Sequence, residues 1–141
     1  MPLYGPSPMR LSLQSDYALR TLMFLASKNA KQRATIAAVA GFFQISEAHV
    51  AKVVNQLSRL GYVRSIRGAG GGIELAQEAK QVRLGEVIIA FEGNMHLLEC
   101  IGTENICVIQ THCKLRSVLA KAERLQFEYL NDVRLADVIP V

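Results

Sequence analysis

The sequence lacks the features that mark secreted and membrane proteins. No secretory hydrophobic region follows the first residues, and the longest apolar runs are too short to cross a bilayer. Cysteine is scarce: the only three are Cys100, Cys107 and Cys113, which fall within one stretch of fourteen residues. We therefore expect a cytoplasmic protein, in which cysteines stay reduced and more often serve metals or redox chemistry than disulfides.

The motifs of common enzymes are missing as well. No nucleophile–base pair and no pair of carboxylates emerges from the sequence, so we expect no enzymatic activity. The glycine-rich run at 67–72 lacks the Lys-Ser/Thr of a phosphate-binding loop, and it lies between two predicted strands rather than before a helix. Nucleotide binding is therefore disfavoured.

Size and charge favour a single globular domain that binds a polyanion. The chain has 141 residues, of which 50% are hydrophobic, which suffices for one compact core and an additional helix. Residues 1–80 carry ten Lys/Arg against four Asp/Glu, whereas residues 81–141 carry six against eight. The basic first half suits a nucleic-acid surface, although scattered surface lysines would give the same total.

Hydrophobic periodicity predicts a mainly α-helical fold with a small β-hairpin in the first half of the chain. A helix from Ser15, with Ser15 or Asp16 as its N-cap, is followed by Ile36–Phe42, which Thr35 caps. A turn at 44–46 leads into the helix Ser46–Leu60, which Gly61 closes, and two strands at 62–66 and 73–75 enclose a glycine-rich tip. Helix, helix, turn, helix and hairpin is the order of a winged helix-turn-helix.

The helix Ser46–Leu60 has the two faces that a recognition helix needs. One face is apolar at helical spacing, and the other is polar. Because the N-terminal end of a recognition helix enters the major groove, five residues there are the candidates for DNA contact. They are Ser46, Glu47, Ala48, His49 and Lys52.

The hairpin tip is the second candidate DNA contact. Its glycines let the backbone approach a phosphate wall closely, and an arginine there suits a narrow minor groove. The candidates are Arg64, Arg67, Gly68, Gly70 and Gly71.

The second half of the chain predicts a connection and a long helix. Leu84–Glu92 has a helical pattern, Gly93–His112 is a long irregular segment, and Cys113–Val133 is a long amphipathic helix. That helix is too apolar to stand alone in water, so we expect it to pack against its twin in a homodimer; the alternative is that it folds back on its own domain.

These patterns divide the chain into four parts. They are a flexible N-terminal arm at 1–8, a winged helix-turn-helix at 9–80, a connecting helix and cysteine-bearing loop at 81–113, and a dimerisation helix with a C-terminal tail at 114–141.

The spacing of the cysteines leaves their role open. Six residues separate the first pair and five the second, which is neither zinc-finger spacing nor the CxxC of a redox enzyme. Long spacings suit a loop around a bulky cluster, but three thiolates are one short of the usual four ligands. The same residues also suit a cluster-free thiol or zinc switch, or three unliganded thiols.

The chain as a whole resembles the winged-helix repressors that carry an iron–sulfur cluster, typified by IscR, RirA and NsrR. The likeness extends from Met9 to about Val138. It rests on Met9-Arg-Leu-Ser-Leu-Gln-Ser-Asp-Tyr-Ala-Leu-Arg20, on Val53-Val-Asn-Gln-Leu-Ser-Arg-Leu-Gly-Tyr-Val63, on Arg67-Gly-Ala-Gly-Gly-Gly72 and on the three cysteines. The resemblance implies a repressor that binds a double-stranded DNA operator under the control of a cluster held by Cys100, Cys107 and Cys113.

Within that family the chain looks most like the nitric-oxide sensor NsrR. In the IscR type a histidine three residues after the third cysteine completes the ligand set, and that position is Arg116 here. In the NsrR type the fourth ligand is an aspartate from the first helix of the other subunit, and Asp16 matches it. The resemblance thus implies a [4Fe–4S] cluster, with [2Fe–2S] as the alternative, and nitric oxide as the signal. The gap between Cys100 and Cys107 approaches that of RirA, which keeps iron, cluster status or redox stress as alternative signals.

Overall fold

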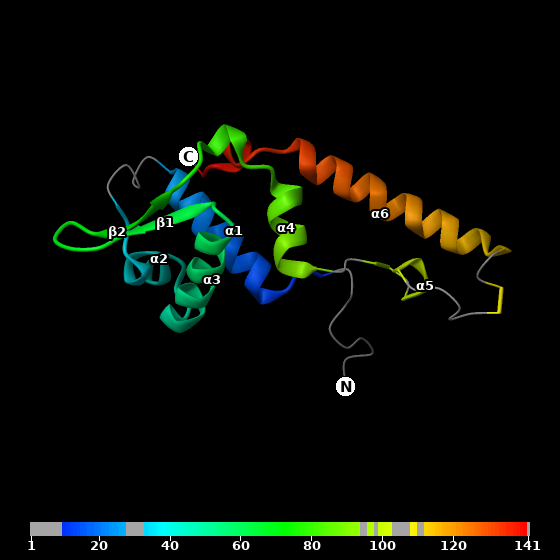
Figure 1. Cartoon of the computed structure of the whole chain (residues 1–141), viewed down its shortest axis with the longest axis horizontal. Coiled ribbons are helices and arrows are strands. Elements are labelled where there is room, and N and C mark those ends of the chain that lie inside the picture. The colour runs from blue at the N-terminus through cyan, green and yellow to red at the C-terminus, as the bar shows by residue number, and fades with distance from the viewer. Residues whose placement is uncertain are drawn as a thin grey trace.

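A computed structural model describes residues 10–27, 33–93, 96–97, 99–102, 108–109 and 112–140, with the backbone alone at 99 and 100. The predicted arm at 1–8 lies outside these residues. Among them, the fold is mainly helical with one antiparallel hairpin, so the predicted fold class is confirmed (Figure 1). The elements are α1 (Leu13–Ala26), α2 (Ile36–Phe43), α3 (Glu47–Arg59), β1 (Val63–Ile66), β2 (Gly72–Leu75), α4 (Leu84–Glu92), α5 (Glu99–Gly102) and α6 (Lys114–Asp132).

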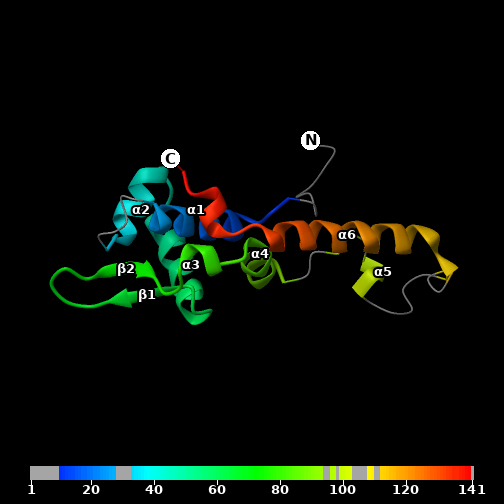
Figure 2. The ribbon, with the colours of Figure 1, turned by 90° about the horizontal axis from the view of Figure 1, so that it is seen from above.

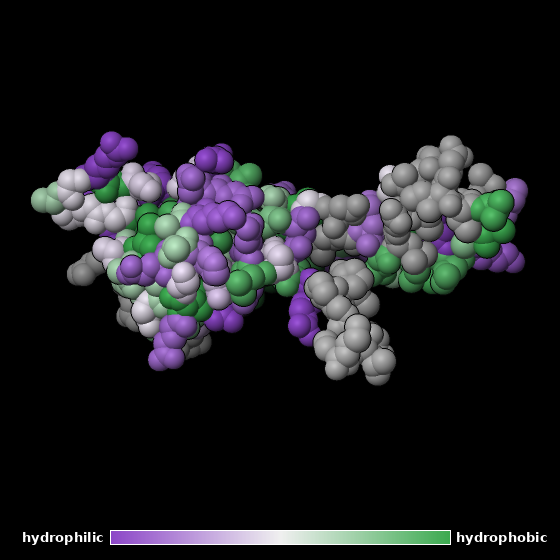
Figure 3. Space-filling view, turned by 90° about the horizontal axis from the view of Figure 1, so that it is seen from below, coloured by the Kyte–Doolittle hydropathy of each residue, from purple (hydrophilic) through white to green (hydrophobic). Residues whose placement is uncertain are grey.

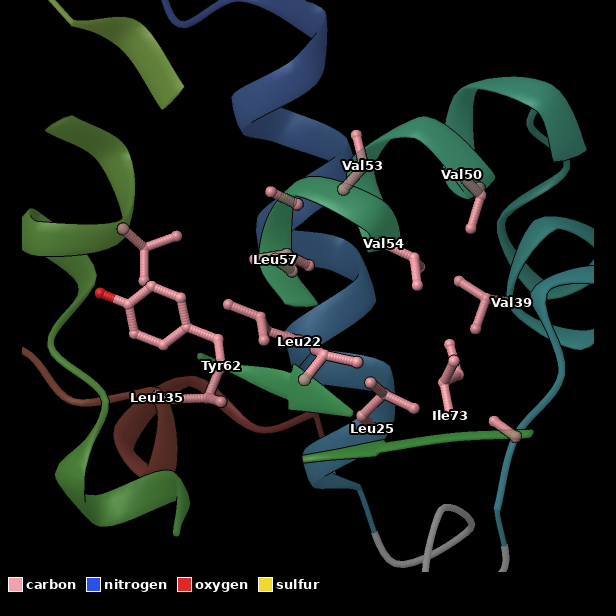
Figure 4. Packing of buried hydrophobic residues seen from close by; sticks show 14 of the residues in the cluster. Leu22, Leu25, Val39, Val50, Val53, Val54, Leu57, Tyr62, Ile73 and Leu135 are labelled. Atoms are coloured by element: carbon pink, nitrogen blue, oxygen red, sulfur yellow. The ribbon is translucent and has the colours of Figure 1, made fainter. Parts of the chain in front are cut away.

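The helices α1, α2 and α3 and the hairpin share one hydrophobic core (Figure 4). Leu22 of α1 and Leu57 of α3 are fully buried at its centre, and Ile73 of β2 closes it from the side of the hairpin. Strands β1 and β2 pair from Val63↔Leu75 to Ile66↔Gly72, which leaves the tip projecting beyond the core. The head of the molecule is therefore a winged helix-turn-helix.

Side-chain caps set where the helices begin. Thr35 caps α2 and Ser46 caps α3, as predicted, each by accepting a hydrogen bond from a backbone N–H three residues on. The predicted cap of α1 is wrong: Ser12 is the N-cap, and its side chain accepts from the backbone N–H of Ser15. The apolar pattern could not show this first turn, because Leu11 and Leu13 there are exposed.

The core continues past residue 80 into the second half of the chain. Val82 and Val87 are buried in the same cluster, and Leu135 joins them from the other end of the sequence. The backbone of Leu84 donates to the carbonyl of Val133 at 3.0 Å, and Leu135 donates to Val82 at 2.9 Å. The C-terminal turn at 135–138 is thereby fastened to the start of α4.

The helix α6 crosses α4 closely and then leaves the body as an arm (Figures 1 and 2). At the crossing, a Cβ on Gly85 would lie 2.8 Å from the backbone nitrogen of Asn131, so only glycine fits there. Beyond the crossing, no side chain of α6 is fully buried. The helix was predicted from Cys113 and begins one residue later, with Cys113 as its N-cap.

The predicted irregular segment between α4 and α6 is not wholly irregular. Its described part contains α5, a single helical turn that lies beside α6. A turn of four residues is too short to produce a visible hydrophobic period, which explains why the pattern did not predict it.

A carboxylate at the end of α4 holds the start of α1. One oxygen of Glu92 accepts from the Ser12 backbone N–H and from the Ser15 hydroxyl, both at 2.6 Å. Burial raises the pKa of Glu92, but the hydrogen bonds from Ser15 and then Ser12 outweigh it and leave the pKa below its usual value. The ionised carboxylate thus caps α1 from a position 80 residues away in the sequence.

We expect Glu92→Gln to lower the free energy of unfolding by about 1 kcal/mol at neutral pH, because it replaces charge-assisted hydrogen bonds with neutral ones. Since the folded-state pKa of Glu92 is depressed, the stabilisation is present above its unfolded pKa and is lost as pH falls through the folded pKa. Urea unfolding should show a constant deficit above about pH 5.5 that shrinks towards pH 3.

The matched control is Glu128→Gln on α6, whose side chain is 60% exposed. It should change the free energy of unfolding by only a few tenths of a kcal/mol at any pH. An equal loss of unfolding free energy in both variants, or a loss in Glu92→Gln that does not depend on pH, would contradict the role of Glu92 in holding the start of α1.

Candidate DNA interface and cluster site

The predicted recognition helix presents its candidate residues to solvent. Ser46, Glu47, Ala48, His49 and Lys52 are all exposed, while Val50, Val53 and Val54 are buried behind them. The polar and apolar faces of α3 are therefore separated as the sequence predicts. Whether these five residues contact DNA stays a prediction.

The hairpin of β1 and β2, the wing, projects from the head as a narrow arm (Figure 2). Gly68 and Gly70 have positive φ angles of 97° and 74°, which side chains rarely adopt, so glycine makes this tight tip possible. Arg67 is exposed at the tip and suits a phosphate contact. Arg64 is less available, because its Nε lies 2.8 Å from Oε1 of Glu74 on the opposite strand.

One further cation lies beside the wing. Arg33 is exposed, and its guanidinium donates a hydrogen bond to the carbonyl of Gly70 at 3.1 Å. Sequence reasoning did not single out Arg33. Nothing local marks it, because 37 residues separate the two partners.

The candidate fourth ligand lies on the solvent side of α1. Oδ1 of Asp16 is 2.9 Å from Nε of Arg20, one helical turn on, and the Asp16 side chain is 42% exposed. The Arg20 guanidinium also lies over the rings of Tyr17 and Phe43, at 5.9 and 5.7 Å from their centroids. The carboxylate is thus held in a defined place and can still be reached from outside its own chain.

The residue next to Asp16 touches the recognition helix. The rings of Tyr17 and His49 have centroids 6.0 Å apart. They line a hollow of about 180 Å³ between α1 and α3, together with Lys52. The helix that carries Asp16 is therefore in direct contact with the end of α3 that is predicted to enter the major groove.

The two cysteines in the described part of the chain lie on α5 and at the start of α6. Cys113 is a half-buried free thiol, and its Sγ accepts from the Arg116 backbone N–H at 3.4 Å at the start of α6. Cys100 lies on α5, and Cys107 lies outside the described residues. Within the described part of the chain, no group of three possible metal ligands converges.

The donors present suit an iron–sulfur cluster. Thiolates are the usual ligands of such clusters, and the position of Cys113 as the N-cap of α6 suits a sulfur that binds a negatively charged centre. Figure 1 shows α1, which carries Asp16 in its first turn, in the head, and the start of α6, which Cys113 caps, at the tip of the arm, so the two elements lie apart within one chain. A carboxylate from a second subunit agrees with this separation.

Two features of this region were missed from the sequence. One is Glu92, the last residue of α4. A negative charge is unfavourable at the C-terminal end of a helix, so its position in the sequence is a hint that it pairs with a distant donor. The other is His96, which pairs with Glu123 of α6 and which no sequence pattern marked.

The part of the chain that the structure describes contains no helix of the length and apolarity that a membrane crossing requires.

Comparison with known proteins agrees with this architecture. Residues 11–140 match the Rrf2 family model, described as an iron-dependent transcriptional regulator. The chain is 39% identical over 132 residues to the HTH-type transcriptional regulator NsrR of Bacillus licheniformis, covering 93% of this chain and 92% of that protein. It is 41% identical over 133 residues to NsrR of Oceanobacillus iheyensis, covering 93% and 90%.

Solved structures share the fold. CymR, the global cysteine regulator of B. subtilis, superposes with a TM-score of 0.72 at 24% identity over 92% of this chain and 95% of that one. T. potens IscR gives 0.73 at 24% identity over 94% and 88%. With a family match across nearly the whole chain, relatives near 40% identity and a winged helix-turn-helix head, the protein belongs to the Rrf2 family of transcriptional regulators, a family of regulators rather than enzymes.

Proposed function

We propose that the protein is a homodimeric repressor that binds a DNA operator under the control of an iron–sulfur cluster and responds to nitric oxide. The observation that carries the proposal is the placement of Asp16 and of the elements that carry Cys100 and Cys113. Asp16 is accessible on α1, which contacts the recognition helix, and the cysteine-bearing elements lie at the end of the α6 arm. The likeness to NsrR supports nitric oxide as the signal.

The α6 arm supports the dimer. Five exposed residues recur at alternating spacings of three and four, which is the seam of a two-stranded coiled coil. They are Leu115, Val118, Ala122, Leu125 and Tyr129. The opposite face of α6, which includes Phe127, lies towards α4. The arm is therefore apolar on both sides, and apolar residues gather along it in Figure 3.

The proposed ligands are those that the family resemblance implies. Cys100, Cys107 and Cys113 hold the cluster, with Asp16 of the partner as the fourth ligand, and [4Fe–4S] is preferred over [2Fe–2S]. When bound, the cluster supplies an iron that a small diatomic molecule attacks more readily at an oxygen ligand than at thiolate. Within the chain, Arg20 orients Asp16, and Tyr17 transmits the position of α1 to His49 of α3.

DNA binding then depends on the spacing of the two recognition helices. In a dimer of this fold the two half-sites are read together, so a small shift between subunits weakens binding steeply. A carboxylate that crosses the interface links the subunits directly. Its release moves α1, and α3 moves with it because Ala18 and Leu22 of α1 are buried against Val50, Val53 and Leu57 of α3 within the same core.

The first test is the visible absorption spectrum of protein purified without oxygen, before and after a small dose of nitric oxide. We expect a broad brown band that bleaches. Asp16→Ala should lose the cluster faster, whereas Asp16→Cys should keep it and react more slowly with nitric oxide, since thiolate replaces the weaker oxygen ligand.

Glu78→Ala is the matched control, because it also removes an exposed carboxylate ion-paired to a neighbouring cation. It should behave as the parent protein. A stable band indifferent to nitric oxide would indicate an iron, cluster-status or redox sensor. A colourless protein without iron or sulfide after reconstitution would exclude the cluster and favour a thiol or zinc switch.

The dimer is tested by Leu125→Glu, which places a charge in the middle of the exposed stripe. We expect sedimentation velocity at micromolar concentration to show a monomer, because a buried unpaired carboxylate is strongly unfavourable. Ser117→Glu introduces the same charge on the same helix away from the stripe and should leave a dimer. Dimers in both variants would place the interface elsewhere.

The DNA interface is tested by Arg67→Ala and Lys52→Ala in titrations against a promoter fragment at several salt concentrations. Loss of one phosphate contact should weaken binding roughly 10-fold and reduce the slope of log K against log salt by about 1. Lys121→Ala on α6 removes an equivalent exposed charge away from the head and should change neither. Equal effects of all three would indicate a general charge effect without a defined interface.

A further inference from the structure

In the described residues that follow α4, the carboxylate of Glu123 holds the chain against α6. Oε1 of Glu123 lies 2.7 Å from Nδ1 of His96, and Oε2 accepts from the backbone N–H of Leu97 at 2.9 Å. The side chains of Glu123 and His96 are only 15% and 35% exposed. Because both oxygens are used on consecutive residues, the contact fixes the backbone as well as the imidazole ring.

The other edge of the same ring lies against α5. A Cβ built on Gly102, the last residue of α5, would be 2.5 Å from Cδ2 and 2.7 Å from Nε2 of His96. The backbone of Gly102 is not in the left-handed region, so an alanine there is acceptable in conformation. The ring of His96 is therefore what excludes a methyl group, and it is wedged between α6 and α5.

This wedge joins the two elements that carry described cysteines. Cys100 lies on α5, and Cys113 is the N-cap of α6, ten residues or about 15 Å of helix before Glu123. Five residues between Gly102 and Val108 lie outside the described part of the chain, so the covalent connection alone says nothing of how these elements sit together. The His96–Glu123 contact holds α5 beside α6 without any bound group.

We propose that His96 and Glu123 form a positioning pair that brings Cys100 and Cys113 into register before a cluster is inserted and slows its loss afterwards. The inference rests on the proposed function for the identity of the bound group, but not for the wedge itself. His96 acts through the protein scaffold and is not a ligand in this scheme. Preorganised ligands retain a metal centre better because less ordering accompanies binding.

The experiment uses the full-length chain in two states. In the cluster-free protein, amide hydrogen exchange followed by mass spectrometry reports on residues 97–102. In protein reconstituted without oxygen, the rate of bleaching by an iron chelator reports on cluster retention. His96→Ala should accelerate both processes on the order of 10-fold, the effect of losing one charge-assisted hydrogen bond, and Glu123→Ala, which loses two, should accelerate them at least as much.

Gly102→Ala tests the wedge most sharply. It should accelerate both processes on the order of 10-fold when His96 is present, because the methyl displaces the ring, and it should add nothing in the His96→Ala background. His96→Asn keeps a donor near the position of Nδ1 but removes the far edge of the ring. It should therefore retain protection at Leu97 and tolerate Gly102→Ala.

Glu128→Ala, an exposed carboxylate on the same helix, is the control and should leave both rates unchanged. Equal effects of Gly102→Ala with and without His96, or unchanged exchange in His96→Ala, would overturn the positioning pair. A parent protein that takes up no cluster would refute the proposed function. The hydrogen-exchange measurements on the cluster-free protein would still test whether His96 holds α5 against α6.

Discussion

The burial of α1 is the constraint on which the rest of the molecule depends. One face of this helix is packed against α3, β2, α4 and the C-terminal turn, with Ala18 and Leu22 fully buried. Its first turn is held by Glu92 at the end of α4. A helix that is packed against this many elements cannot move alone, because protein interiors are close-packed. Asp16 on the exposed side of α1 is therefore connected through packed contacts to α3 and to the end of α4.

The molecule divides its contacts between a compact head and an extended arm. The head buries its apolar residues within one chain, whereas α6 keeps a row of large apolar side chains exposed. The crossing at Gly85 and the backbone pairing of Leu84 with Val133 fasten the arm at one end only. This arrangement joins the proposed subunit interface on α6 to the head, which carries the proposed DNA surface.

The two candidate regions have different physical characters. The recognition helix and the wing are preformed: their caps, strand pairing and buried faces are complete within the chain. In the described part of the cysteine-bearing region, the Glu123 carboxylate makes two contacts with the chain that follows α4. In the proposed sensor, the element that responds needs lower local stability than the element that reads DNA.

The order of the helices, the caps Thr35 and Ser46 and the hairpin could all be predicted from the sequence, because period and capping depend on neighbouring residues. The polar face of α3 and the family were also predicted from the sequence. The sequence could not determine that Ser12 rather than Ser15 caps α1, or that α5 forms. The tertiary structure alone decided that Glu92 meets Ser12, that His96 meets Glu123 and that Leu135 returns to the core. The residues in these contacts are far apart in the sequence: His96 and Glu123 are separated by 27 positions, and Ser12 and Glu92 by 80. Only the way the chain folds back brings them together.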